Sequence, residues 1–112
     1  MQAKLAYAIK FVADMDKAVA FHRDVLGLTL RFATPRYTEF ATGETTLALH
    51  EASDVNPAGK VQLGFSTEEL DAFYAGRDAA GVTFTQAPRD QHGTPISRLL
   101  DNEGTEISLS GR

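Results

Sequence analysis

The sequence predicts an α+β protein in which a strand–helix–strand–strand–strand module occurs twice along one chain. Three observations lead to this prediction. Apolar segments with the composition of strands alternate with two segments of helical periodicity. The order of elements in the first half returns in the second half. The length of 112 residues is that of one ordinary domain, and a hydrophobic content of 43% suffices for a core.

The first half opens with an apolar strand over residues 5–12, followed by a helix that Asp14 can cap. Apolar side chains recur at helical spacing as far as Gly27, which stands where a helix-ending glycine belongs. The apolar positions of this helix are Ala18, Phe21, Val25 and Leu26. The segment LGLTLRF then restarts as a strand, and two more strands follow over residues 37–42 and 45–52 with a hairpin turn between them.

The second half repeats this order from a strand over residues 61–65. Ser66 and Glu69 have the spacing of a capping box, so a helix is expected to start there and to end at Gly81. A strand VTFTQ follows, and residues 87–95 are predicted to form a polar turn region. The last two strands are ISRLL and TEISLS, joined by a turn.

Matching segments support an internal duplication. The segment GLTL after the first helix corresponds to GVTF after the second, and TTLAL corresponds to TEISL. The modules are therefore expected over residues 1–52 and 60–112 of a single domain, with a linker over residues 53–59. A ferredoxin-like sheet with two helices is the alternative, but it leaves strand-like segments unused.

Charge and composition exclude several classes of protein. The formal net charge is −4, which argues against a nucleic-acid partner because such proteins usually carry a basic face. The absence of cysteine excludes disulfides, thiolate metal ligands and cysteine nucleophiles, and it fits a cytoplasmic protein. The apolar stretch at the start is too short for a membrane span, and no targeting segment or membrane partner is expected.

The segment DMDKAVAFHRDVLGLTL resembles the vicinal oxygen chelate superfamily, also called the glyoxalase/bleomycin resistance/dioxygenase superfamily. The family usually has tyrosine where this chain has His22. The segments ATGETTLALHEA and LLDNEGTEISLS extend the resemblance over nearly the whole chain. The resemblance implies a curled, cup-shaped mixed sheet with helices outside and a small-molecule ligand inside. It also implies a homodimer.

Metal-dependent members of the family place one ligand in the first and one in the fourth strand of each module. The positions implied here are Tyr7 and Ala48 in the first module and Gln62 and Ser108 in the second. None of the four is a good ligand, because divalent iron, zinc, nickel or manganese prefers imidazole or carboxylate groups. No metal and no other cofactor is therefore expected, and a divalent metal is disfavoured.

His50 and Glu106 each lie two residues from one of these positions, and therefore on the same face of their strands. They are weak candidates for a displaced acid–base pair, because a histidine beside a carboxylate titrates near neutrality. As a metal site the pair lacks a third protein ligand. The simpler interpretation is a histidine that bonds backbone or solvent at a strand end.

Several side chains are candidates to line the cup. They are Tyr7, Phe40, His50, Gln62, His92, Arg98, Glu106 and Ser108. For Phe40 the simpler alternative is a plain core residue, and for His92 it is a solvated turn. Arg98 either points inward and binds an anion or extends to solvent.

Three functions remain open at this point. The first and favoured one is a metal-free protein that binds a small molecule, of the drug-sequestering type, and the acidic net charge suits a cationic ligand. The second is an enzyme: either a metal-dependent lyase, isomerase or dioxygenase with non-standard ligands, or a metal-free enzyme that uses His50 and Glu106. The third is a structural or regulatory module. The polar groups expected in the cup argue against it, since an idle core seldom keeps so many.

Overall fold

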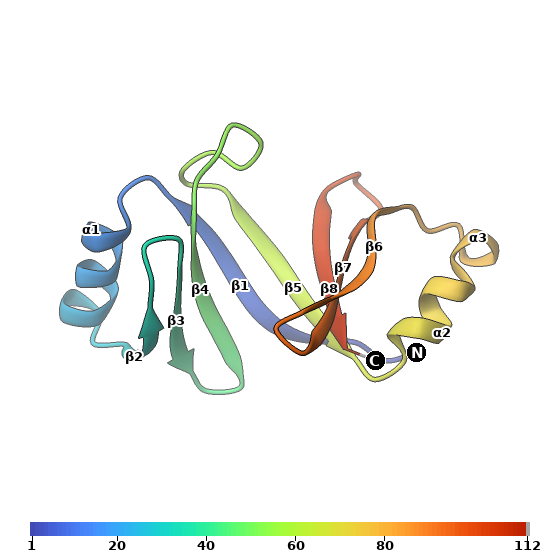
Figure 1. Cartoon of the computed structure of the whole chain (residues 1–112), viewed down its shortest axis with the longest axis horizontal. Helices are drawn as coiled ribbons and strands as arrows, with labels where there is room; N and C mark the ends of the chain where they lie inside the picture. The colour runs from blue at the N-terminus through green and yellow to red at the C-terminus, as the bar shows by residue number, and fades with distance from the viewer. Residues whose placement is uncertain (112) are drawn as a thin grey trace. The chain divides into compact units, whose positions relative to one another are not determined.

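The computed structural model of the chain describes residues 1–111 and contains two successive βαβββ modules (Figure 1). The first module comprises β1 (Lys4–Val12), α1 (Met15–Ala20), the π-helix η1 (Phe21–Val25), β2 (Thr29–Ala33), β3 (Tyr37–Thr42) and β4 (Thr45–Glu51). The second comprises β5 (Val61–Thr67), α2 (Leu70–Ala75), α3 (Arg77–Ala80), β6 (Phe84–Gln91), β7 (Thr94–Leu100) and β8 (Glu106–Gly111). The predicted α+β class and the repeated module are confirmed.

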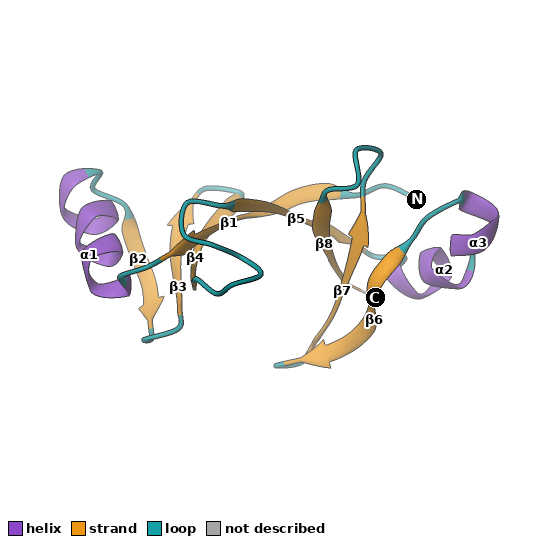
Figure 2. Ribbon diagram, turned by 90° about the horizontal axis from the view of Figure 1, so that it is seen from above, coloured by secondary structure: helices purple, strands orange, loops and turns teal. Residues whose placement is uncertain are grey.

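The chain divides into two compact units. The first unit is Ala6–Gln62, and the second unit combines residues 1–5 with the segment that begins at Leu63. Figure 2 shows that each unit carries its helices against one side of its own strands. Among the described residues, no helix is long and apolar enough to span a membrane.

The strands of the first unit lie in the order β2-β3-β4-β1. β1 runs parallel to β4, while β3 is antiparallel to both of its neighbours. The helix-covered face of this sheet holds a core of Val12, Val19, Phe40 and Leu49. Because side chains alternate between the two faces of a strand, the residues next to Phe40 and Leu49 point to the opposite face.

The N-terminus of α1 is capped as predicted. The Asp14 carboxylate accepts a hydrogen bond from the Lys17 backbone N–H at 3.0 Å. The helix then widens into η1, and Phe21, Val25 and Leu26 remain exposed rather than joining the core. His22 lies at the edge of the core, where its Nδ1 is 2.7 Å from the Ala18 carbonyl oxygen.

The strands of the second unit lie in the order β5-β8-β7-β6, around a core of Leu70, Leu99 and Leu109. The predicted capping box is wrong, because β5 continues through Ser66 to Thr67 and the helix begins at Leu70. The Thr67 hydroxyl instead accepts a hydrogen bond from the Glu69 backbone N–H at 3.2 Å. The predicted single helix is divided at Gly76 into α2 and α3, and it ends as expected at Gly81 with φ of 70°.

The predicted turn region over residues 87–95 is also wrong. β6 extends to Gln91 and β7 starts at Thr94, so the turn consists of His92 and Gly93 alone. Both turn residues have positive φ, 55° and 87°, as a tight two-residue hairpin requires. Pro88 lies where the β6–β7 register shifts, which accommodates a residue without a backbone N–H inside a strand.

Candidate functional site

The candidate site is the helix-free face of the sheet in the first unit. Leu47 and Leu49 of β4 pack toward α1, so Thr46, Ala48 and His50 point to the other face. The β1–β4 register adds Tyr7, Ile9 and Phe11 to this face, opposite those three residues. The β3–β4 register adds Tyr37 and Glu39 in the same way. The face therefore gathers polar and aromatic side chains from three neighbouring strands.

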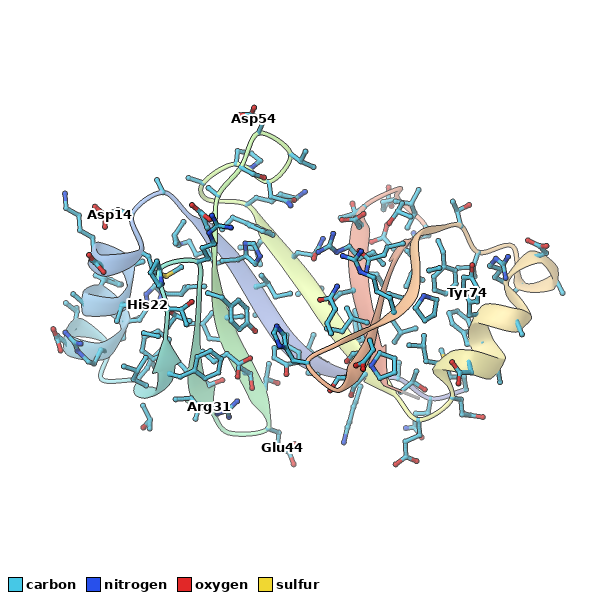
Figure 3. All side chains as sticks on the ribbon, in the orientation of Figure 1. Asp14, His22, Arg31, Glu44, Asp54 and Tyr74 are labelled. Carbon is cyan, nitrogen blue, oxygen red and sulfur yellow. The ribbon has the colours of Figure 1, made fainter. Side chains whose placement is uncertain are left out.

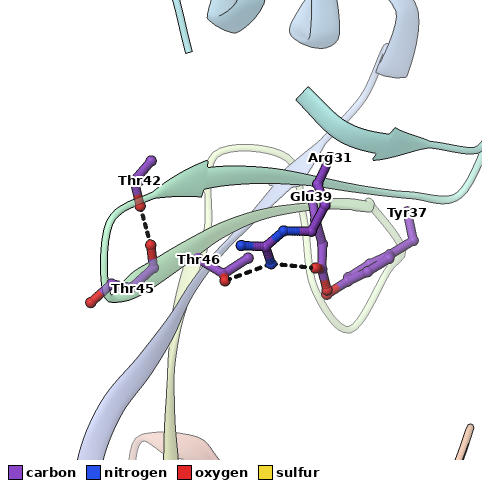
Figure 4. Close-up of polar contacts among 6 residues, drawn as sticks. All are labelled: Arg31, Tyr37, Glu39, Thr42, Thr45 and Thr46. Carbon is purple, nitrogen blue, oxygen red and sulfur yellow. Dashed lines mark hydrogen bonds and ion pairs between the residues drawn. The ribbon is translucent and has the colours of Figure 1, made fainter. Parts of the chain in front are cut away.

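Arg31 of β2 joins this face through its polar contacts (Figures 3 and 4). Its Nη1 donates to Glu39 Oε1 at 3.1 Å and to Thr46 Oγ1 at 3.0 Å. The Tyr37 hydroxyl donates to Glu39 Oε2 at 2.7 Å. These four residues, Arg31, Tyr37, Glu39 and Thr46, are called the Arg31 cluster below. Both oxygens of its carboxylate hold a donor, so the Glu39 side chain is fixed between Arg31 and Tyr37.

The hairpin that joins β3 and β4 holds the cluster in register. The Thr42 hydroxyl donates to the Thr45 backbone carbonyl at its base (Figure 4). The pairing of Glu39 with Ala48 then brings Glu39 beside Thr46, its diagonal neighbour on the same face.

Burial and the Glu39 carboxylate raise the pKa values of the two tyrosines on this face. The pKa of Tyr37 is raised far above its ordinary value, first by burial and then by its hydrogen bond to Glu39. The pKa of Tyr7 is also raised, mainly by burial and secondarily by the charge of Glu39, while Arg31 opposes the rise. Both side chains therefore stay neutral hydrogen-bonding groups over the physiological pH range.

Replacing Tyr37 with phenylalanine is expected to change how stability depends on alkaline pH. A pKa raised in the folded protein gives stability that is present below the unfolded value of 10.0 and lost as the pH rises above it. The free energy of unfolding of the unaltered protein should therefore fall more steeply above pH 10 than that of Tyr37→Phe. Urea unfolding between pH 7 and 11 measures this, and parallel profiles would contradict the prediction.

His50 stands at the edge of the same face among aromatic rings. Its ring centroid lies 5.2 Å from that of Phe11 and 6.1 Å from that of Tyr37. Its Nδ1 is 2.9 Å from the Glu51 carbonyl oxygen. A carbonyl only accepts, so Nδ1 is the donor in this contact.

The second unit holds the other predicted residues. Arg98 of β7 is the cross-strand partner of Ser108 in β8, so both lie on the helix-free face of that unit's sheet. Glu106 accepts a hydrogen bond from the Thr85 hydroxyl at 2.6 Å. His92 lies in the β6–β7 turn. Gln62, at the end of the first unit in β5, is buried.

The predicted site residues are thus divided between the two units. Tyr7 and His50 lie on the face that holds the Arg31 cluster, whereas Phe40 belongs to the core because its side chain is 0% exposed on the helix-covered face. His50 is in the first unit and Glu106 in the second, and their pairing stays a prediction. The cluster itself was missed. Its only signal in the sequence is that Tyr37 and Glu39 alternate with the two residues that the fold buries, Thr38 and Phe40.

The four positions that the family resemblance assigns to a metal do not fit one. Ala48 has no donor atom and is fully buried, and the raised pKa of Tyr7 disfavours the phenolate that would bind a cation. Gln62 and Ser108 offer only neutral oxygens. Within residues 1–111, no three His, Cys, Asp or Glu side chains come together as a metal site would need.

The sequence model of the Glyoxalase/Bleomycin resistance protein/Dioxygenase superfamily matches residues 4–109. The chain belongs to this superfamily. A comparison with curated proteins finds no match.

Solved structures with the same fold cover almost the whole chain. The hypothetical protein BH1468 from Bacillus halodurans C-125 has a TM-score of 0.82 at 16% identity, over 100% of this chain and 96% of its own. Methylmalonyl-CoA epimerase in complex with methylmalonyl-CoA and NH4+ has a TM-score of 0.81 at 19% identity, over 99% and 95%. A superfamily member from Vibrio splendidus 12B01 has a TM-score of 0.76 at 11% identity, over 99% and 100%. At these identities the likeness concerns the fold.

Proposed function

We propose that this protein binds a small organic molecule on the helix-free face of its first unit, and that it does so without a metal ion. The observation that carries the proposal is the Arg31 cluster, in which a guanidinium is held by Glu39 and Thr46 beside a row of aromatic rings. A small number of fixed polar groups among apolar side chains is what small-molecule sites generally provide.

The state of the polar groups supports binding over a purely structural role. A structural ion pair is normally satisfied on both sides, and Glu39 meets this condition because both of its oxygens accept hydrogen bonds. Arg31 does not, since its side chain is 45% exposed and its described contacts all use Nη1. The cluster therefore keeps hydrogen-bonding capacity available to a ligand.

The chemistry of the donor set supports a role without a metal. The residues at the family's ligand positions do not fit a divalent cation, as described above, so the chain's own hydrogen bonds and ring contacts would hold the ligand. A sequestering protein needs no more than this. The homodimer implied by the family resemblance is part of the same proposal, and the exposed apolar side chains of Phe21, Val25 and Leu26 support it.

Fragment binding followed by backbone NMR tests the proposed function. The protein is treated with a chelator and titrated with a mixed set of small aromatic acids, amines and neutral compounds. We expect the largest shifts of amide signals in β1, β3 and β4 at residues of the helix-free face, such as Tyr7, Tyr37 and His50, with no need for added metal. Binding that appears only after a divalent metal is added, or shifts confined to other parts of the chain, would contradict the proposal.

A further inference from the structure

We infer that Arg31 binds the carboxylate of the ligand, which makes the ligand a small, flat organic acid. This inference rests on the proposed function and adds the chemical class of the ligand. It concerns one edge of one side chain, the Nε–Nη2 edge of the Arg31 guanidinium.

A guanidinium has two parallel N–H groups along that edge, and they match the two oxygens of a carboxylate. Within residues 1–111, the hydrogen bonds of Arg31 use Nη1, and Nε and Nη2 have no partner (Figure 4). Arg23 shows what the same edge does when a carboxylate is near. Its Nε and Nη2 donate to the two oxygens of Asp24 at 2.7 and 3.0 Å. The edge that Arg23 uses for a carboxylate is the edge that Arg31 presents.

The Arg31 side chain is held in place before any ligand arrives. Glu39, whose side chain is only 12% exposed, and Thr46 both accept from Nη1, and Tyr37 fixes Glu39 from its other oxygen. A side chain that is already ordered loses less conformational entropy when it binds. The contacts thus orient Arg31 through Nη1 and leave its Nε–Nη2 edge without a partner among the described residues.

Aromatic rings beside Arg31 indicate that the acid is flat. Phe32, the next residue in β2, is 43% exposed, and its ring centroid lies 5.9 Å from that of Tyr37. The contacts of His50 with Tyr37 and with Phe11 continue the row on the same face. A planar ring or conjugated group can pack against such a row while its carboxylate reaches Arg31.

The charge of this face favours an acid over a cation. The net charge of −4 suits a cationic ligand, but that number describes the whole chain. On this face the carboxylate of Glu39 is already paired through both of its oxygens, and the charged group with unused donors is the guanidinium. The local arrangement therefore supports an acid in place of the cationic ligand that the net charge suggests.

Benzoate and its neutral counterpart benzamide test the inference, because they share a flat ring and differ in the carboxylate. Dissociation constants of both are measured by NMR titration of the whole protein, of Arg31→Gln and of Arg31→Lys. Arg23→Gln is the matched control, since the Arg23 side chain is 48% exposed and donates its hydrogen bonds to the neighbouring residue, Asp24. Thermal denaturation of each variant verifies that it folds.

We expect benzoate to bind about tenfold more tightly than benzamide, as a paired charge-assisted hydrogen bond allows. Arg31→Gln should remove this preference and leave the benzamide constant unchanged. Arg31→Lys should recover only a small part, because an ammonium lacks the planar edge. Arg23→Gln should behave like the unaltered protein.

Three results would overturn the inference, and they are distinguishable. If both compounds shift the helix-free face equally and Arg31→Gln changes neither constant, the carboxylate assignment is wrong while the proposed function stands. If neither compound nor any member of the mixed fragment set shifts that face, the proposed function fails and the inference fails with it. If Arg31→Gln does not fold, the test depends on Arg31→Lys. A full preference of Arg31→Lys for benzoate over benzamide would show that the contact is not bidentate.

Discussion

Replacing Phe40 with alanine is expected to lower the free energy of unfolding by about 3–5 kcal/mol, the usual cost of emptying a fully buried phenylalanine site. Phe40 is 0% exposed and packs with Val12, Val19 and Leu49 between α1 and the sheet. Removal of the ring leaves a cavity where the helix and the strands meet, and the rigid strands close it only in part. Urea unfolding measured by circular dichroism gives the value.

Phe32→Ala is the matched control for this experiment. Phe32 lies on the strand next to Phe40 but is 43% exposed on the opposite face, so its loss should cost less than about 1 kcal/mol. Equal losses for the two variants would show that Phe40 does not belong to the core. In that case the sequence-based expectation that Phe40 contacts the ligand would become the better one.

Replacing Glu39 with alanine is expected to lower the free energy of unfolding by about 2 kcal/mol. It should also make the Arg31 side chain less ordered in the proposed binding site. The partly buried Tyr37 hydroxyl loses its acceptor, and Arg31 loses the partner that orients it. Arg31 is half-exposed and recovers contacts with water, so the cost stays below that of a fully buried ion pair. Chemical unfolding gives the stability, and the benzoate titration gives the effect on binding.

A double-mutant cycle with Tyr37→Phe identifies the source of this loss. If the Tyr37–Glu39 hydrogen bond contributes as described, the double variant should be more stable than the sum of the single effects predicts, by about 1 kcal/mol. The conservative variant Glu39→Gln keeps an acceptor for Tyr37 and should therefore cost less than alanine. Purely additive effects would mean that the two side chains act independently.

Elements with strong local signals could be predicted from the sequence. The Asp14 cap is a local hydrogen bond within one helical turn, and the glycine at position 81 adopts the positive φ that its place after a helix suggested.

The errors arose where tertiary contacts override a local pattern. The pair Ser66 and Glu69 has the spacing of a capping box, yet pairing of Ser66 and Thr67 with β8 extends the strand through the expected cap position. A polar turn region was expected over residues 87–95, but the register shift beside Pro88 lets β6 continue.

Only part of the candidate site could be predicted. The family resemblance assigned Tyr7 its position in the first strand, and the two-residue period of a strand then placed His50 on the same face as the family's fourth-strand position. Arg31 did not, since nothing in its own strand shows that a register shift in β2 brings it beside Glu39 and Thr46. Arg31 and Thr46 are fifteen residues apart in the sequence, and the contact between them exists only after β3 and β4 have paired.

Local patterns were therefore sufficient for the α+β class and the repeated βαβββ module, because both follow from short-range periodicity, which a linear sequence carries directly. The superfamily, and the positions at which its metal-dependent members hold their ligands, were implied instead by the resemblance of whole segments. The Arg31 cluster was decided by the tertiary structure. Strand register sets which side chains face each other across the sheet, and register depends on hydrogen bonds between strands that are distant in the chain. For the same reason the overall charge of the chain suggested a cationic ligand, while the arrangement of charges on one face of a sheet favours an acid.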